Sequence, residues 1–191
     1  VLACGGFEAN REMRTRYLGP GWDLCKVRGT RFNQGDGLKM ALDIGAMPWG
    51  HWSGCHATPI VASAPDYGRR DMTDKTNRLS YTQGVMLNVE GKRWVDEGAD
   101  FNSYTYAKYG GMILKQPQSL IYQIFDSKVL DMLEPRYSTS TPFKSDTLEG
   151  LIKQLKVDHA QAIKSVNEYN AAAGHGTFNA IELDKMHTEG I

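Results

Sequence analysis

The sequence has no long apolar run and no excess of charge of either sign. No stretch of it approaches the roughly 20 apolar residues that a helix needs to cross a bilayer. The 22 basic and 22 acidic residues balance, so the composition does not predict a basic surface for nucleic acid or for an anionic membrane. We therefore expect no nucleic-acid partner.

Cysteine is also scarce, and the usual motifs of metal and dinucleotide sites are missing. The three cysteines, Cys4, Cys25 and Cys55, lie far apart and form no CxxC pair, which favours reduced, buried thiols. The five histidines have no spacing typical of a metal site, so we expect no metal. The sequence also lacks the G-x-G-x-x-G fingerprint of a dinucleotide-binding turn.

What the chain does contain is typical of a folded globular protein. It has 191 residues, of which 41% are hydrophobic and 10% aromatic. Val1–Ala3 has the character of a buried strand without its beginning, and residues 188–191 resemble a loop cut short. We expect the sequence to be a piece of a longer chain.

Residues 1–46 have the pattern of an α/β unit. An apolar strand runs into Gly5 and Gly6, whose missing Cβ atoms permit a tight turn and a close approach of the backbone to a ligand. A helix is predicted over Glu8–Leu18. Asp36 is predicted to be the N-cap of a second helix that stops at Gly45.

The middle of the chain is predicted to be mostly irregular, followed by strands and one helix. Residues 47–83 show no sustained periodicity, and a stretch of this length is usually functional. Val85–Val89 and Arg93–Val95 are predicted to form a hairpin. A helix capped by Ser103 is predicted to run to about Leu114, and a buried strand is predicted over Leu120–Phe125.

The last third of the chain is predicted to be helical. Asp146 with Glu149 resembles a capping box. A second helix is expected to start at Asp158 and stop at Gly174, with three residues facing inward: Ala160, Ile163 and Val166. The sequence therefore predicts an α+β domain preceded by a piece of α/β domain.

Four segments together resemble a family of FAD-dependent oxidoreductases that includes fumarate reductases, succinate dehydrogenases, aspartate oxidases and ketosteroid dehydrogenases. They are residues 1–7 (VLACGGF), 35–41 (GDGLKMA), 54–59 (GCHATP) and 84–97 (GVMLNVEGKRWVDE). Two further stretches, residues 74–81 (DKTNRLSY) and 100–110 (DFNSYTYAKYG), are similar to the tricarballylate dehydrogenase branch of that family.

The resemblance implies a domain order and an activity. Residues 1–46 would be a fragment of the FAD-binding α/β domain, residues 47–180 the capping domain with a mixed sheet and helices, and residues 181–191 the start of the return to the FAD domain. The activity implied is oxidation of a polycarboxylate, tricarballylate to aconitate, by hydride transfer to FAD. Whether FAD is bound covalently stays open.

The family also implies a partner and a location. An iron–sulfur membrane protein would reoxidise the flavin, and the enzyme would be cytoplasmic, at the inner face of a membrane through that partner. Two alternatives stay open: a flavoenzyme similar to fumarate reductase or to ketosteroid dehydrogenase, and a non-catalytic substrate-binding fragment.

Two groups of site residues follow from the matched motifs. The FAD contacts would come from Ala3, Gly5, Gly6 and Asp36, for which the plain alternative is a strand turn and an ordinary helix cap. The substrate contacts would come from five residues: His56, Thr58, Asn77, Arg78 and Asn102.

Arg78 and Asn102 are departures from the fumarate reductase pattern. Arg78 stands where that pattern has a Glu, so it is expected to pair with a third carboxylate of the substrate by a bidentate fork; the alternative is a surface arginine. Asn102 lies where the family has a proton-donating arginine nearby, and an amide cannot ionise. Tyr104 or Tyr106 is a possible substitute, so the identity of the base stays open.

Overall fold

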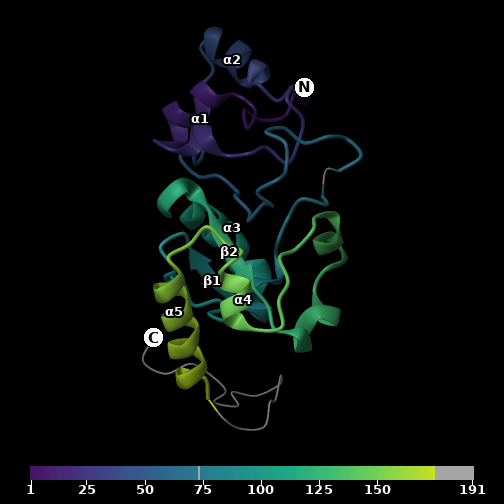
Figure 1. Cartoon of the computed structure of the whole chain (residues 1–191). Coiled ribbons are helices and arrows are strands. Elements are labelled where there is room, and N and C mark those ends of the chain that lie inside the picture. The colour runs from purple at the N-terminus through teal and green to yellow at the C-terminus, as the bar shows by residue number, and fades with distance from the viewer. Residues whose placement is uncertain (73, 175–191) are drawn as a thin grey trace.

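The computed structural model describes residues 1–72 and 74–174, which form five α-helices and one small sheet linked by long irregular segments (Figure 1). The helices are α1 (Arg11–Leu18), α2 (Asp36–Asp43), α3 (Asn102–Ile113), α4 (Leu148–Ile152) and α5 (His159–Ala172), and the strands are β1 (Val85–Asn88) and β2 (Ile121–Ile124). Short 3₁₀ segments cover Trp22–Leu24, Ser80–Gln83, Pro117–Ser119, Ser127–Met132 and Pro135–Thr139.

The N-terminal part contains the two helices expected there. Helix α1 begins after Asn10, whose side chain accepts a hydrogen bond from the Met13 amide, and it ends at Gly19 with a positive φ of 103°. The strand expected over Val1–Ala3 is wrong, because these residues are exposed and have no strand partner in the described part of the chain. A strand needs a neighbour to satisfy its backbone groups.

Helix α2 begins one residue away from its expected cap. Gly35 is the N-cap, with a left-handed φ of 88°, and Asp36 is the first helical residue, where its charge favours the positive end of the helix. The helix ends at Asp43, just before Gly45, which has a φ of 88°.

The sheet is antiparallel and has two strands within the described residues, so the expected mixed sheet is not found there. Strand β1 pairs with β2, with Val85 opposite Ile124 and Asn88 opposite Ile121. The hairpin expected with Arg93–Val95 is reduced to a turn around Gly91 and a single bridge between Leu87 and Arg93. The second strand of the sheet is therefore the one predicted over 120–125.

Of the three helix starts in the second half, one differs from expectation by two residues, one by a single residue and one not at all. Phe101 rather than Ser103 is the N-cap of α3, and Thr147 rather than Asp146 caps α4 by accepting from the Gly150 amide. Asp158 caps α5 as predicted, by accepting from the Gln161 amide. Of the three residues of α5 predicted to face inward, Ala160 is wrong, because it is exposed and Ala162 is buried instead.

The core lies on the two faces of β1. Val85 and Leu87 face α4 and α5, where they pack with Ile152, Leu155, Ala162 and Val166. Met86 points to the opposite face and packs with Tyr81 and Tyr109. This alternation is the period of two expected for a strand, and it places the sheet between α5 on one side and α3 on the other.

Residues 60–68 join the N-terminal part to the rest. Val27 forms a parallel bridge with Tyr67, the Val27 amide donates to Asp66 at 2.8 Å, and the Gly68 amide donates to Gly29 at 2.9 Å. The division of the chain at residues 46 and 47 remains a prediction. The expected return segment, 181–191, lies outside the described residues, as do residues 175–180 at the end of the capping domain.

None of the helices in residues 1–72 and 74–174 is long and apolar enough to cross a membrane. All three cysteines are free, but Cys4 and Cys55 are exposed, so the expectation of buried thiols is wrong for these two.

Candidate active site

His56 lies on an irregular loop that passes over α3. Its Nε2 atom is 2.5 Å from the hydroxyl oxygen of Tyr106, and the two rings meet edge to face with centroids 4.8 Å apart. His56 is exposed and Tyr106 is half-buried. The pair is thus open to solvent and to a small molecule on one side.

Helix α3 approaches this loop closely because Gly110 has no side chain. A Cβ atom on Gly110 would lie 2.5 Å from the Ala57 carbonyl carbon and 2.5 Å from the Thr58 amide nitrogen. The tight contact fixes the loop on the helix. It therefore holds His56 beside Tyr106 and Thr58 beside Asn77.

Asn77 is the centre of a polar cluster that includes Thr58 of the loop. Its side chain is fully buried. The amide orientation that gives both of its atoms partners has the nitrogen donating to Thr58 Oγ1 at 3.1 Å and the oxygen accepting from Arg28 at 3.0 Å and Arg136 at 3.2 Å. A buried amide with all these partners is fixed in one position.

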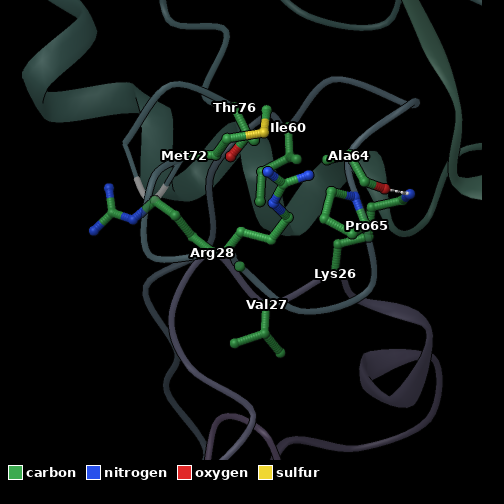
Figure 2. A pocket seen from close by; sticks show the side chains of 10 residues that line it. Lys26, Val27, Arg28, Ile60, Ala64, Pro65, Met72 and Thr76 are labelled. Atoms are coloured by element: carbon green, nitrogen blue, oxygen red, sulfur yellow. Dashed lines mark hydrogen bonds between the residues drawn. The ribbon is translucent and has the colours of Figure 1, made fainter.

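Arg28 and Arg136 also share the exposed carboxylate of Asp74. The Oδ1 atom of Asp74 lies 3.2 Å from Arg28 and 3.5 Å from Arg136. Figure 2 shows Arg28 with Ile60, Met72 and Thr76 around a pocket of about 10 Å³, which is room for one water molecule. Neither arginine is predictable from the sequence, because no local motif marks them and only the fold brings residues 28, 77 and 136 together.

Arg78 is buried, so it is not the surface arginine of the alternative interpretation. Its terminal nitrogens donate to the Lys75 and Asn77 carbonyls and to two hydroxyls on the facing segment, Thr139 and Ser140. Burial lowers the pKa of the Arg78 guanidinium. No described carboxylate forms an ion pair with it, and its role in binding substrate stays a prediction.

Asn102 is held inward at the start of α3. The side-chain amide nitrogen of Asn102 donates to the Leu79 carbonyl at 3.2 Å, and the backbone carbonyl of Asn102 accepts from the Tyr81 hydroxyl at 3.1 Å. The Tyr81 hydroxyl also lies 2.6 Å from Thr105. The structure thus links four of the five predicted substrate residues (Thr58, Asn77, Arg78 and Asn102) through segment 77–79, with His56 two residues from Thr58.

The residues predicted to contact FAD form two loops that pack against each other. The Gly35 amide donates to the Gly6 carbonyl at 3.1 Å, and a Cβ atom on Gly37 would lie 2.9 Å from Cys4 Cβ. Ala3, Gly5 and Asp36 are exposed beside this contact. These residues fit one wall of a flavin site, with bare backbone and one acidic side chain, but they do not enclose it.

The loop that carries His56 connects this wall to the substrate residues. Trp52 stacks on Phe7, directly after Gly6, with ring centroids 6.3 Å apart and an angle of 13° between the planes. Tyr17 completes the aromatic cluster, 4.9 Å from Trp52. Residues 52–58 therefore run from the predicted cofactor wall to α3 and Asn77.

Comparison with known proteins finds the chain similar to part of several oxidoreductases. No model of a known protein family matches the chain. It is 29% identical over 180 residues to a probable fumarate reductase of Shewanella frigidimarina, a match that spans 92% of this chain and 28% of the relative. The similarity supports an oxidoreductase at the level of the family.

Two solved structures of oxidoreductases are similar to the chain in fold. The open conformation of a flavocytochrome c3 fumarate reductase matches 91% of the chain with a TM-score of 0.66 and 26% identity. The 3-ketosteroid Δ1-dehydrogenase of Sterolibacterium denitrificans, solved with 1,4-androstadiene-3,17-dione, matches 87% with a TM-score of 0.59 and 25% identity. The chain spans less than a third of each of these proteins and of the curated relative.

Proposed function

We propose that the chain is part of an FAD-dependent dehydrogenase that oxidises a polycarboxylate, with tricarballylate to aconitate as the reaction. The observation that carries this proposal is the course of residues 52–58. Trp52 packs on the glycine loop at Phe7, and Thr58 reaches Asn77 six residues later. This proposal is supported by the fact that one short loop connects the predicted cofactor wall with the predicted substrate residues.

The polar groups of this site suit a carboxylated substrate. His56 is exposed and can donate a hydrogen bond to a carboxylate, and Thr58 offers a hydroxyl two residues away. Arg28 and Arg136 face two carboxylates, that of Asp74 and that of Glu134. The third arginine, Arg78, follows Asn77 and donates only to carbonyls and hydroxyls, so its positive charge favours binding of an anion.

Ala3, Gly5, Gly6 and Asp36 would hold part of the flavin, with Asp36 accepting hydrogen bonds from its polar groups. The flavin supplies the chemistry of accepting a hydride. The protein's own residues bind the acid, orient it and take the proton. An iron–sulfur membrane protein is the partner we propose for reoxidation.

A second candidate function is reduction of a dicarboxylate such as fumarate, or dehydrogenation of a ketosteroid. The curated relative and the two solved structures named above favour this candidate, because they are two fumarate reductases and a ketosteroid dehydrogenase. The cluster of Arg28, Arg136 and Arg78 favours an acid over a neutral steroid.

The test is anaerobic turnover, with three substrates, of the flavin-loaded longer protein of which this chain is proposed to be part. We expect bleaching of the flavin absorbance on addition of tricarballylate, and much less with succinate or with a 3-ketosteroid. His56→Ala should weaken turnover of the acids, whereas His51→Ala, in the same exposed loop, is the matched control and should change little. Bleaching by the ketosteroid alone would reject the polycarboxylate proposal.

A further inference from the structure

We propose that Tyr106 is the residue that exchanges a proton with the substrate carbon, and that His56 is its proton acceptor. The inference rests on the proposed function and names the base that the sequence left open. Its basis is the direct contact between Nε2 of His56 and the hydroxyl of Tyr106.

Three acidic residues near the substrate cluster lie beside arginines, and one of them, Asp74, is shared by Arg28 and Arg136. Glu97 is buried and accepts hydrogen bonds from the Met86 amide and from Arg93, both within 2.7 Å. Asp96 is exposed and lies near the same arginine. Asn102 has no proton to give or take, since an amide does not ionise in this pH range.

The four tyrosines on or beside α3 differ in what their hydroxyls contact. Tyr81 and Tyr109 are buried, and their hydroxyls donate to the Asn102 and Asp96 carbonyls. Tyr104 is 75% exposed, and its ring lies beside Phe101. Of these four, only Tyr106 has its hydroxyl on an imidazole, in a place that solvent and a ligand can reach.

A hydroxyl paired with an imidazole is a common way to make a base near neutral pH. A tyrosine alone holds its proton up to a pKa of about 10, whereas a histidine changes charge near about 6.5. An adjacent imidazole can take the hydroxyl proton as the hydroxyl oxygen takes another. For this transfer Nε2 of His56 must be the unprotonated nitrogen, with the proton on Nδ1.

In the direction of oxidation, one proton and one hydride leave adjacent carbons of the substrate. The Tyr106 oxygen takes a proton from one substrate carbon while the phenol proton passes to His56 Nε2. A flavin held at the wall formed by Ala3, Gly5, Gly6 and Asp36 would accept the hydride, with its electron pair, from the neighbouring carbon, and the second bond would form between the two carbons. The His56 imidazolium then returns its extra proton to water.

The experiment compares Tyr106→Phe with Tyr104→Phe, the same change two residues away on the exposed side. In the 191-residue chain labelled with nitrogen-15 histidine, the Nε2 resonance of His56, assigned by its loss in His56→Gln, should move in Tyr106→Phe and not in Tyr104→Phe. In the flavin-loaded protein, Tyr106→Phe should lower kcat for tricarballylate about 100- to 10,000-fold, the range for loss of a general acid or base. KM should change little, and Tyr104→Phe should keep the wild-type kcat. Circular dichroism checks that each variant is folded.

Each outcome decides between the two proposals. An Nε2 resonance that does not move in Tyr106→Phe, or a variant that keeps the wild-type kcat, overturns the inference and leaves the proposed function in place. A wild-type protein that oxidises none of the acids overturns the proposed function and this inference with it.

Discussion

At the scale of single residues, Arg78 joins two segments that are far apart in the sequence. Its guanidinium donates to Thr139 and Ser140, each at 3.0 Å, and lies over the ring of Tyr137. Removing it leaves the carbonyl of buried Asn77 without this donor, together with three acceptors on more exposed residues, the Lys75 carbonyl and the Thr139 and Ser140 hydroxyls. A buried group left in that state costs about 1–3 kcal/mol.

We therefore expect Arg78→Ala to lower the free energy of unfolding by about 2–3 kcal/mol in urea denaturation. Arg70→Ala is the matched control, because Arg70 is exposed and such changes usually stay within about 0.5 kcal/mol. If the two variants unfold at the same urea concentration, the packing role of Arg78 is wrong.

The substrate role of Arg78 has a separate readout. If Arg78 pairs with a third carboxylate, Arg78→Ala should weaken kcat/KM for tricarballylate far more than for succinate. A broken, desolvated charged pair costs roughly 2–5 kcal/mol, which corresponds to a loss of about thirty- to several-thousand-fold. Equal losses for the two acids would contradict that role and leave Arg78 as a structural residue.

Glu97 gives a prediction about pH. Burial raises the pKa of Glu97 above its ordinary value of 4.5, although hydrogen bonds from Met86 and Arg93 act in the opposite direction. The folded state therefore keeps this proton to a higher pH than the unfolded chain, so the contribution of Glu97 to stability falls as the pH rises from 4.5 through the raised pKa.

The measurement is the free energy of unfolding from about pH 4 to about pH 7, for the wild type and for Glu97→Gln, which cannot titrate. The wild-type value minus the variant value should decrease with rising pH. A difference that increases over this range would mean that the ion pair with Arg93 outweighs burial.

At the scale of elements, the contact between α3 and the His56 loop depends on one glycine. Gly110 leaves no space for a methyl group, whereas the Cβ position of its neighbour Gly111 meets only the tip of Trp22, at 4.0 Å. We expect Gly110→Ala to destabilise the protein and to displace the loop. Gly111→Ala should stabilise it by about 0.5–1 kcal/mol, because alanine is the better helix former.

Thermal unfolding and the His56 imidazole resonances measure the two effects. The midpoint should fall in Gly110→Ala and rise slightly in Gly111→Ala, and only the first variant should shift the His56 signals. Similar midpoints in both variants would show that the loop adapts to the helix without cost.

The elements themselves were largely predictable from the sequence, and their pairing was not. Asn10, Asp158 and the glycines at 19 and 45 lie at the helix ends where local chemistry puts them. The partner of β1 is a long-range choice. The turn at Gly91 favours Arg93–Val95, but the apolar face of Ile121–Ile124 completes the core, and local sequence does not contain that information.

Only part of the candidate site was predictable, because several of its contacts join residues that are far apart in the sequence. The motifs around His56, Asn77 and Asn102 mark residues that the structure brings together. Arg28 and Arg136 reach Asn77 only through tertiary contacts. Likewise, the choice between Tyr104 and Tyr106 depends on which face of α3 meets the loop, and the spacing of two tyrosines does not settle this.

At the scale of the whole molecule, the N-terminal part is joined to the sheet and its helices through residues 60–68 (Figure 1). A Cβ atom on Gly68 would lie 1.7 Å from the Arg28 carbonyl oxygen, whereas one on Gly29 would meet nothing within 4 Å. Gly68→Ala should therefore open this junction, and Gly29→Ala is the matched control.

Hydrogen exchange measures the opening directly. In the wild type, exchange should be fast in Val1–Ala3 and slow in β1. In Gly68→Ala the amide of Val27, which donates to Asp66, should exchange faster, while β1 stays protected. Loss of protection in β1 as well would mean that the two parts unfold as a single unit.

The turn after β1 also has a consequence for the order of folding. The Asp158 amide donates to the Val89 carbonyl at 3.1 Å, and the Cβ position of Gly91 lies 2.5 Å from the Ala162 amide nitrogen, so the first turn of α5 rests on this turn. The two segments are separated by most of the second half of the chain, and closing so long a loop costs entropy before any contact repays it. We therefore expect helix α5 to dock late, and until it does the apolar face of Val85 and Leu87 is open to other chains.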